Sequence, residues 1–592
     1  MNVFTGARQS QQPRKQNAEP KTTFHISEPW GRVGYRSKRV GWLMLVAIGA
    51  LGFIATRLLM VQVVDREQHL GEISRHITRS TITGERGNIL ARDGSFLATT
   101  DSAITIGANP RLIVSAQATA LAIAPILDMP TQKIYELLSK DLSYVHLQRE
   151  VPAHIADRVR ALELPGIEYR EEPDRVYPNG NEFARNLLGQ VDRDEKPLNG
   201  IELQFADLLA GQSGSRADYV AAFDSVKLPG GDLNYEPPKP GYDIETTLHA
   251  PIQRLVEEIL KDAVLASGAN WATAIVLDVP TAEVLALADI DHFKESGQAR
   301  VAGASSAYAK QFEPGSVAKT FTIAAAIEEG LTRPDEVFNV PHLYQYSDKP
   351  FREPYVYEDR ELTVTQILSK SSNIGTIQIA ERLGPDQMYH YLRAFGLGQY
   401  SSGDRDNPSF PHETRGKLKP PQDWEGIDLA AISFGQGVSV TAIQIAAAYN
   451  TIANNGKYKP SSLVRGFVTS EGASRTMDTS FGQEVLSATT AKQMRAMLES
   501  VVMDGTGKRA AVEGYGVGGK TGTAQKPLID QRGYGDSYTT IFAGFAPVED
   551  PKVTVVVVLD EPLEYKAGFT AAPVFSEIAA RTLGILGVPK TR

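Results

Sequence analysis

The sequence predicts an α+β protein in which a single N-terminal membrane helix precedes a middle module and a larger C-terminal domain. Three observations support this prediction. A run without charged residues begins at residue 40, a Pro/Gly-rich polar stretch covers 225–243, and β-like segments occupy both ends of 236–592 with helical segments between them. At 592 residues the chain is too long for one hydrophobic core, so we expect several domains.

Residues 40–60 form the expected transmembrane helix. The stretch 40–55 has no charged side chain, and apolar residues resume after Thr56 and Arg57, which gives the roughly 20 residues that span a bilayer. Arg57 lies near the far end, where its side chain can extend to the interface. A cleaved signal peptide and a buried core helix are the alternatives. The long basic region before the run and the lack of an A-x-A site after it argue against a signal peptide. The basic flank and the length of the run argue against a core helix.

Residues 1–39 are expected to be a disordered cytoplasmic tail, because the first 30 residues are polar and rich in Gln, Pro and Lys. A basic flank holds an N-terminus on the cytoplasmic side, so the rest of the chain is expected to lie across the membrane. The tail has only two acidic residues, Glu19 and Glu28, against eight basic residues: Arg8, Arg14, Lys15, Lys21, Arg32, Arg36, Lys38 and Arg39.

Residues 61–235 are interpreted as a non-catalytic module. Arg92-Asp93-Gly94-Ser95 predicts a hairpin turn, Asn179-Gly180 marks another turn, and 115–128 and 131–140 have helical spacing. A domain boundary is predicted within the Pro/Gly-rich stretch. The charged residues of the module are interpreted as ion pairs that fix one part against another, with a functional role as the alternative; they include Arg86, Arg175 and Glu202.

Residues 236–592 are expected to form an antiparallel sheet flanked by helices. Segments 272–277 and 283–287 predict a hairpin, and 539–545 and the valine-rich 553–559 predict further strands. Helices are predicted at 316–329, 363–383, 441–454 and 488–503.

The composition restricts the chemistry of the whole chain. The net charge of −9 argues against general nucleic-acid binding. The absence of cysteine excludes disulfides, a cysteine nucleophile, thiolate metal sites and a lipid anchor on cysteine. The ten histidines are scattered without an H-E-x-x-H pattern, so we expect neither a metal nor another cofactor.

Three short motifs in the C-terminal domain together predict a serine acyl-transfer site in which lysine activates the nucleophile. Each motif alone has a plain structural explanation: a chance S-x-x-K spacing, a helix cap or a surface turn. Their joint occurrence in this order makes the prediction specific. They are Ser316-Val317-Ala318-Lys319, Ser371-Ser372-Asn373 and Lys520-Thr521-Gly522-Thr523.

Ser316 opens a predicted helix and Lys319 lies one turn further on, so the two side chains share a face. The helix-start amides and the positive end of the dipole lie beside the hydroxyl. Lysine serves as a base when desolvation or a neighbouring cation lowers its pKa, and Lys520 is the candidate cation.

The other two motifs supply proton relay and substrate binding. Ser371 is predicted to relay a proton, and Asn373 to hold a peptide amide through its donor and acceptor. Lys520 and the neighbouring threonine hydroxyls suit a substrate carboxylate, while the glycines of this strand indicate close approach of a ligand. A backbone N–H from this strand and that of Ser316 would form an oxyanion hole, in which each donor contributes roughly 100- to 1,000-fold in rate.

On these motifs the chain resembles the class B penicillin-binding proteins, which are monofunctional peptidoglycan D,D-transpeptidases, and most resembles their septal cell-division branch (FtsI-type). The resemblance covers about residues 36–588. It also rests on Arg86-Gly87-Asn88-Ile89, Asp93-Gly94, Arg175-Val176-Tyr177-Pro178, Gly200-Ile201-Glu202, Phe312-Glu313-Pro314-Gly315, Phe434-Gly435-Gln436-Gly437, Thr441, Gln444 and Ala543-Gly544-Phe545-Ala546-Pro547.

The resemblance implies an elongated pedestal followed by a serine β-lactamase-like transpeptidase domain. It implies that Ser316 attacks the carbonyl between the last two D-alanines of a stem peptide and that an amine of a neighbouring stem peptide then takes the acyl group. β-Lactams would acylate Ser316 instead. The implied roles are a base for Lys319, proton transfer and positioning for Ser371 and Asn373, binding of the terminal carboxylate for Lys520, Thr521 and Thr523, and a further oxyanion donor from the Thr523 N–H.

The resemblance also implies a place in the bacterial cytoplasmic (inner) membrane, with the catalytic domain outside. The pedestal would contact divisome proteins, and the expected close partner is the membrane glycan polymerase FtsW. The chain departs from the family pattern in two places, neither of which touches the three motifs. Thr246-Thr247-Leu248-His249 stands where Leu-Thr-Ile-Asp is expected, and Thr281-Ala282-Glu283 where Thr-Gly-Glu is usual.

Four alternatives remain. An elongation-type member of the same family would differ in partner and not in chemistry. A serine β-lactamase or D,D-carboxypeptidase would use water as acceptor, but the membrane span and the large module argue against it. A β-lactam sensor would need a cytoplasmic effector or several spans, and residues 1–39 supply neither. A catalytically silent scaffold does not explain three intact motifs.

Overall fold

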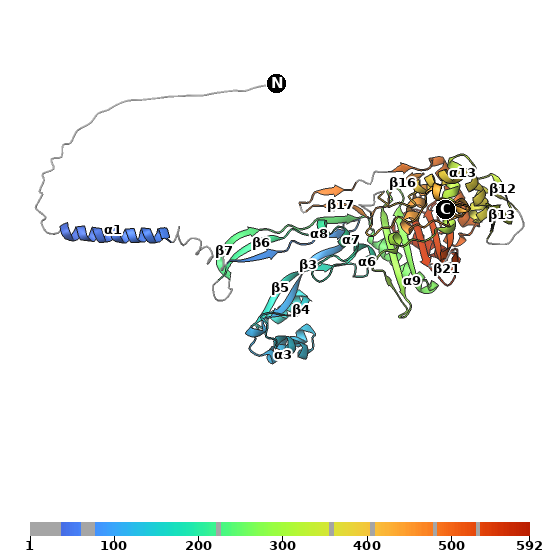
Figure 1. The fold of residues 1–592 in the computed structure, drawn as a ribbon. Helices are drawn as coiled ribbons and strands as arrows, with labels where there is room; N and C mark the ends of the chain where they lie inside the picture. The colour runs from blue at the N-terminus through green and yellow to red at the C-terminus, as the bar shows by residue number, and fades with distance from the viewer. Residues whose placement is uncertain are drawn as a thin grey trace, which may run out of the picture. The chain divides into compact units, whose positions relative to one another are not determined.

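A computed structural model describes residues 37–60, 77–220, 227–353, 360–402, 409–469, 471–477, 482–528 and 533–592 (Figure 1). The predicted tail lies outside the described residues as far as residue 36. Backbone contacts divide the chain into two units. The first comprises Met1–Ser80 and Ala217–Asn234, and the second comprises Thr81–Arg216 and Tyr235–Arg592.

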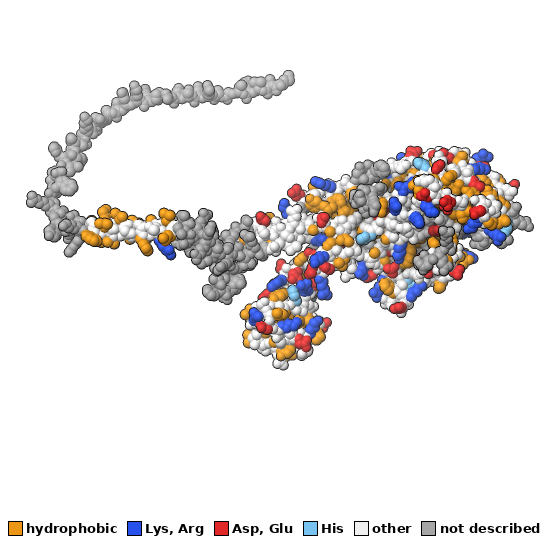
Figure 2. All heavy atoms as spheres, in the orientation of Figure 1, with side chains coloured by type: hydrophobic (Ala, Val, Ile, Leu, Met, Phe, Trp, Pro, Cys, Tyr) orange, Lys and Arg blue, Asp and Glu red, His pale blue; other side chains and the backbone are white. Residues whose placement is uncertain are grey.

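The first unit contains the helix α1, Ser37–Leu59, which agrees with the predicted span. Among the described residues α1 is the one helix long and apolar enough to cross a membrane. Its surface consists mostly of hydrophobic and uncharged atoms (Figure 2). The Thr56 hydroxyl donates to the carbonyl of Gly52 at 2.7 Å, so this polar group is satisfied within the helix. A three-stranded sheet, β1-β6-β7, belongs largely to the same unit; its strands are Ile77–Ile82, Gly214–Val220 and Lys227–Glu236.

The second unit begins with a seven-stranded sheet in the order β18-β17-β8-β2-β3-β4, with β5 also paired to β3. The predicted hairpin turn joins β2 and β3, and there Gly94 has a φ of +82° while Asp93 Oδ1 accepts the Ser95 N–H. The strands are β2 Ile89–Leu90, β3 Phe96–Ala108, β4 Val145–Val151, β5 Ile167–Val176, β8 Asp243–Thr246, β17 Val464–Val468 and β18 Ser474–Thr476.

The predicted helices of the module are present. Helix α3 begins after Ser115, whose hydroxyl accepts the Ala118 N–H as an N-cap. Ile106, Ile123 and Val159 belong to a separate small core beneath these helices. The helices are η2 Pro110–Leu112, α3 Ala116–Leu127, α4 Thr131–Leu138, α5 Ala153–Arg160, α6 Arg185–Leu188, α7 Gly200–Gln204 and α8 Ala206–Leu209.

The strand after the Pro/Gly-rich stretch belongs to the sheet of the module. β8 pairs in parallel with β2 and antiparallel with β17, which comes from much later in the sequence. Composition marks where the chain turns, but backbone pairing decides which sheet a strand joins. The chain therefore passes from module to C-terminal domain after β8 and returns to the module at β17.

The charged residues singled out in the module form a buried ion-pair cluster, as interpreted from the sequence. Glu202 on α7 accepts from Arg86 Nε at 2.6 Å and from Arg175 Nε at 2.8 Å, and its side chain is fully buried. The guanidinium of Arg175 also donates to the carbonyl of Gly87 at 2.8 Å. The cluster thus ties β5 and α7 to the segment that precedes β2.

The C-terminal domain is built on a six-stranded sheet in the order β11-β10-β9-β22-β21-β20, and every pairing in it is antiparallel. The valine run of β22 is buried on both faces: Val555 and Val557 point into one core, and Val556 and Val558 into the other. The strands are β9 Trp271–Asp278, β10 Val284–Phe293, β11 Gln298–Val301, β20 Gly518–Pro527, β21 Tyr534–Ala546 and β22 Val553–Asp560.

Helices cover both faces of this sheet, as the α+β prediction requires. α9, Ala250–Ser267, and α17, Ala571–Ile585, pack on one face. The larger helical layer on the other face consists of α10 Ser306–Ala309, η3 Gly315–Ala318, α11 Lys319–Glu328, α12 Val364–Ser369, α13 Asn373–Ala394, η4 Pro421–Asp423, α14 Asp428–Ser433, α15 Ala442–Ala453 and α16 Ala488–Asp504. The short helix η5, Lys508–Ala510, packs against α17 on the first face.

The helical stretch predicted over 363–383 consists of two helices, α12 and α13, one before the second motif and one after it. Ser371 between them has a φ of +60°, which no helix accommodates, and the Ser372 hydroxyl caps α13 by accepting the Gly375 N–H. Short two-stranded ribbons complete the domain: β12 Val337–Val340 with β15 Arg360–Thr363, β13 Leu343–Tyr346 with β14 Lys349–Arg352, and β16 Lys457–Tyr458 with β19 Gln483–Glu484.

Candidate active site

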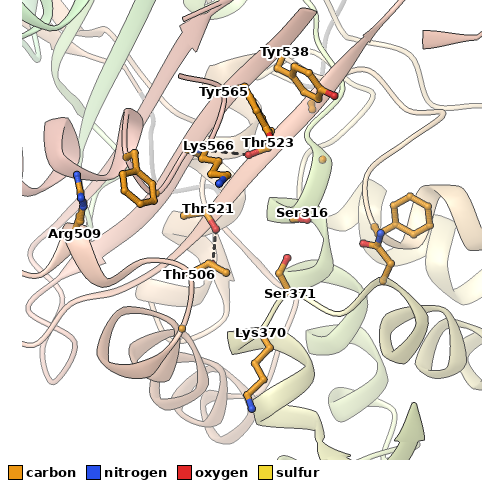
Figure 3. A pocket seen from close by; sticks show the side chains of 18 of the residues that line it. Ser316, Lys370, Ser371, Thr506, Arg509, Thr521, Thr523, Tyr538, Tyr565 and Lys566 are labelled. Carbon is orange, nitrogen blue, oxygen red and sulfur yellow. Dashed lines mark hydrogen bonds between the residues drawn. The ribbon is translucent and has the colours of Figure 1, made fainter. Parts of the chain in front are cut away.

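The three predicted motifs meet at one cleft of about 670 Å³ (Figure 3). Each motif contributes residues to its lining: Ser316 from the first, Ser371 and Asn373 from the second, Thr521 and Thr523 from the third. The two lysines of the motifs, Lys319 and Lys520, are fully buried beneath this lining. Segments separated by about 200 residues of sequence therefore form one site.

Ser316 lies in a tight turn that starts α11. Gly315 has a φ of +55° and its N–H donates to the carbonyl of Gly435 at 3.0 Å, which fixes the turn. Ser316 follows in η3, and Lys319 is the first residue of α11, one turn later. The predicted arrangement of nucleophile and lysine is therefore present.

Strand β20 packs directly against this turn, and Gly522 makes the approach possible. A Cβ atom on Gly522 would lie 2.9 Å from the carbonyl oxygen of Pro314 and 3.0 Å from Cγ1 of Val317. The glycine was expected to admit a ligand. In the structure it admits the backbone of the nucleophile turn, because β20 is the edge strand that faces η3; its approach to a ligand stays a prediction.

Both buried lysines converge on Ser371. Lys319 Nζ donates to the Ser371 carbonyl at 2.6 Å and to its hydroxyl at 3.2 Å, while Lys520 Nζ donates to the same hydroxyl at 3.0 Å. The left-handed backbone of Ser371 turns both oxygens toward Lys319, and such strain is typical of functional sites. Within the described residues Ser316 has no hydrogen bond to Lys319, so the Ser371 hydroxyl is the group that joins the two lysines.

Burial controls the protonation of the pair. Desolvation lowers the pKa of Lys319 to about 7, and the carboxylate of Glu353 opposes this shift. Desolvation lowers the pKa of Lys520 well below its usual value, and the charge of Lys319 lowers it further. The repulsion expected from the sequence thus acts on Lys520, while burial itself makes Lys319 a base near neutral pH.

Glu353 is a residue of the site that sequence reasoning missed. Its carboxylate accepts from the Ser372 hydroxyl, from the Asn373 N–H at 2.9 Å and from the Ile374 N–H at 3.1 Å. It therefore occupies the N-terminus of α13, where an acidic group is favoured, and holds the second motif in place. No local pattern marks it, since its partners lie about 20 residues later in the sequence.

The side of the cleft formed by β20 contains further residues without a motif. The hydroxyls of Thr521 and Thr506 are 2.6 Å apart, and the Thr523 hydroxyl accepts the Ala567 N–H at 3.4 Å. The second contact holds the segment 565–569 against β20. Other lining residues that sequence reasoning missed are Tyr538, Tyr565, Lys566 and Phe569.

This arrangement can perform acyl transfer. It combines a hydroxyl at the start of a helix, a buried lysine that is partly neutral near pH 7, and a second hydroxyl that connects two lysines. The described residues contain no group of three or more metal-ligating side chains. Fold and site together define a serine acyl-transfer enzyme on an antiparallel sheet.

Comparison with known proteins gives the family. Residues 272–580 match the penicillin binding protein transpeptidase domain, and residues 81–246 match the penicillin-binding protein dimerisation domain. The chain is 33% identical to penicillin-binding protein PbpB of Mycolicibacterium smegmatis over 93% of its length and 90% of the relative. It is 29% identical to peptidoglycan D,D-transpeptidase FtsI of Escherichia coli over 93% and 92%.

Solved structures support the same family. Penicillin-binding protein 3 of Mycobacterium tuberculosis, in complex with aztreonam, superposes with a TM-score of 0.67 at 28% identity and covers 87% of this chain and 98% of its own. The chain therefore belongs to the class B penicillin-binding proteins, is FtsI-like, and is a serine-type transpeptidase.

Proposed function

We propose that the protein is a peptidoglycan D,D-transpeptidase that cross-links stem peptides during septal wall synthesis and that Ser316 forms its acyl-enzyme. The observation that supports this most directly is the convergence of Ser316, Lys319, Ser371 and Lys520 at one cleft. The likeness to the D,D-transpeptidase FtsI supports the substrate class and the septal role.

In the acylation step the Ser316 hydroxyl attacks the carbonyl between the two terminal D-alanines. Its proton passes to neutral Lys319, and the carbonyl becomes a tetrahedral oxyanion held by the N–H groups of Ser316 and Thr523. The C–N bond then breaks. The leaving D-alanine takes a proton through the Ser371 hydroxyl, which two lysines contact, and an ester on Ser316 remains.

In the second step an amine of a neighbouring stem peptide attacks this ester. The amine loses a proton to the lysine–serine pair, the new amide bond forms, and Ser316 regains its hydrogen. Asn373 lines the cleft, where its amide would hold the peptide backbone. Thr521, Gly522 and Thr523 would bind the donor along β20, and β-lactams would acylate Ser316 in the same pose.

The proposed function also implies an organisation of the chain into four parts. Residues 1–39 would be a cytoplasmic tail, 40–60 the membrane anchor, 61–235 a pedestal and 236–592 the transpeptidase domain outside the cytoplasmic membrane. The long apolar helix α1 supports the anchor. FtsW and other divisome proteins are the proposed partners of the pedestal.

Mass spectrometry of the full-length protein after treatment with benzylpenicillin tests the nucleophile. We expect a penicilloyl adduct on the tryptic peptide that contains Ser316, and none in Ser316→Ala. An adduct elsewhere, or cross-linking of glycan by Ser316→Ala in a purified assay, would overturn the assignment.

A D-Ala-D-Ala-type thioester tests the acceptor. With an added amine we expect the amide product, because an amine is the natural acceptor of a transpeptidase. Release of free acid that no amine diverts would instead indicate a carboxypeptidase or a β-lactamase.

Depletion of the protein in its host separates the septal role, which predicts undivided filaments, from the elongation role, which predicts rounded cells.

A further inference from the structure

The lining of the cleft has an unusual charge balance for a protein with a net charge of −9. Among the described residues that line it, none is acidic and four are basic. A cleft with only positive charges attracts an anionic ligand. The basic residues are Lys370, Lys508, Arg509 and Lys566.

Of these four, two have a partner and one points away from the nucleophile. Lys508 forms an ion pair with Asp504 at 3.4 Å, and the guanidinium of Arg509 lies 4.0 Å above the ring of Phe569. Lys370 points away from Ser316 and Thr523 (Figure 3). The Lys566 side chain, in contrast, points into the cleft toward the part of β20 that carries Thr521 (Figure 3).

The backbone under Lys566 is held on both sides. Tyr565 stacks on Tyr538 with ring centroids 4.9 Å apart, and the Ala567 N–H donates to the Thr523 hydroxyl. Ala567 is buried, and the Lys566 N–H donates to the carboxylate of Glu564 at 2.9 Å. The ammonium of Lys566 is thus presented from a fixed segment beside the nucleophile.

The expected cation for the donor carboxylate, Lys520, does not reach the cleft. It is fully buried, and its ammonium donates to Ser371 and to the Thr521 carbonyl. The Thr521 and Thr523 hydroxyls line the cleft but carry no charge. A carboxylate bound there therefore needs a cation from another element, and Lys566 points to that place.

Building on the proposed function, we propose that Lys566 is a specificity-determining residue that binds the carboxylate of the acyl donor. This carboxylate is the C-terminal one of a D-Ala-D-Ala peptide, or the corresponding group of a β-lactam. The Lys566 ammonium donates a charge-assisted hydrogen bond to it, and the hydroxyls of Thr521 and Thr523 complete the contact. Acyl donors that have no carboxylate at this position cannot form this charge-assisted hydrogen bond.

The test compares benzylpenicillin with its uncharged methyl ester on the full-length protein in detergent. We expect Lys566→Gln to lower the second-order acylation constant for the acid roughly tenfold and to leave that for the ester unchanged. Lys566→Arg should stay within about threefold of the wild type, since the charge is kept. The matched control Lys508→Gln removes another exposed lysine of the cleft, one that pairs with Asp504, and should not change the acid-to-ester ratio.

Salt provides a second measurement. Between about 50 and 500 mM NaCl the preference of the wild type for the acid should shrink, whereas that of Lys566→Gln should not. Equal losses for acid and ester in Lys566→Gln, or no loss for either, would overturn the proposal while leaving the proposed function intact.

If neither compound acylates the wild type, the proposed function fails, and non-covalent binding still decides the role of Lys566. In the Ser316→Ala background, calorimetry with benzylpenicillin and its ester should show tighter binding of the acid that Lys566→Gln abolishes. Equal affinity for acid and ester in Ser316→Ala would overturn the proposal.

Discussion

Two clusters of buried charge in this molecule are built in opposite ways. In the module, the single carboxylate of Glu202 lies between the guanidinium groups of Arg86 and Arg175, and each arginine has a direct ion pair. In the cleft, Lys319 and Lys520 face the same hydroxyl of Ser371, and neither has an ion pair within the described residues.

The difference shows which buried charges stabilise the fold and which can take part in the reaction. Paired buried charges hold distant segments together. Removal of one partner strongly destabilises the fold, because the other charge stays buried without a counter-ion. For unpaired buried lysines, desolvation instead lowers the pKa, so that they lose part of their charge near neutral pH and one of them can act as a base. Both clusters are buried. The presence of a paired acid makes the first cluster structural, and its absence makes the lysines of the second available for proton transfer.

The largest expected effect comes from removal of the base. Lys319→Met replaces the lysine with an uncharged side chain of similar length, and acylation by benzylpenicillin should fall about 100- to 10,000-fold. The free energy of unfolding should fall by no more than about 1–3 kcal/mol, because the hydrogen bonds to Ser371 are lost but no ion pair is, and a desolvated amine is replaced by an apolar group. Stopped-flow acylation and urea unfolding measure the two quantities. A large loss of stability with a normal acylation rate would contradict the comparison.

The reverse pattern is expected in the module. Glu202→Gln leaves two buried guanidinium groups with one neutral acceptor and should lower the free energy of unfolding by about 3–5 kcal/mol. The acylation rate of the folded protein should stay within about twofold, since the cluster lies outside the cleft. The control Glu577→Gln breaks an exposed pair with Arg581 and should change stability by less than about 0.5 kcal/mol.

The pH dependence of acylation sharpens the comparison further. Because the pKa of Lys319 is lowered to about 7, the lysine is protonated below this pH and cannot accept the Ser316 proton. The acylation constant should rise about tenfold per pH unit up to about pH 7 and then level off. A profile that stays flat through pH 7 and rises only near pH 10 would show that burial does not shift the lysine.

The first motif of this site could be predicted from the sequence because its spacing is local, and the other two could be predicted from their residue types and their order along the chain. Ser316 and Lys319 lie one turn apart. The valine run of β22 predicts a buried strand, and the apolar stretch of α1 predicts a membrane helix. Glu353 and Lys566 could not be predicted, since each reaches the site through contacts with segments remote in sequence. Likewise, β8 and β17 join the sheet of the module through pairing that composition does not record.

Glu353 connects the two behaviours, because it is a buried acid that influences Lys319 without an ion pair to it. Glu353→Gln removes a carboxylate that raises the pKa of Lys319 and that holds the start of α13. We expect acylation near pH 7 to fall about tenfold through misplacement of Ser371, and the midpoint of the pH profile to move to lower pH. A slower rate with an unmoved midpoint would assign Glu353 a purely structural role.

The smallest expected effect concerns a third cluster of charge, which is only partly buried. Glu283 on the edge of the C-terminal domain pairs with Arg465 at 2.8 Å and Arg92 at 3.6 Å, and it follows Ala282, where the family usually has glycine. Ala282 has a φ of +59° and is fully buried. The left-handed backbone disfavours alanine by roughly 1–2 kcal/mol, whereas the buried methyl group contributes about 0.8 kcal/mol.

Ala282→Gly should therefore change the free energy of unfolding by no more than about 1 kcal/mol, because relief of strain and loss of the methyl group nearly cancel. Ala282→Val should lower it by more than about 2 kcal/mol, since a β-branched side chain tolerates neither the positive φ nor the packed site. Urea unfolding of both variants gives the two values. If the glycine variant were the less stable of the two, the turn would depend on packing and not on backbone conformation, and Glu283 would owe its position to that packing.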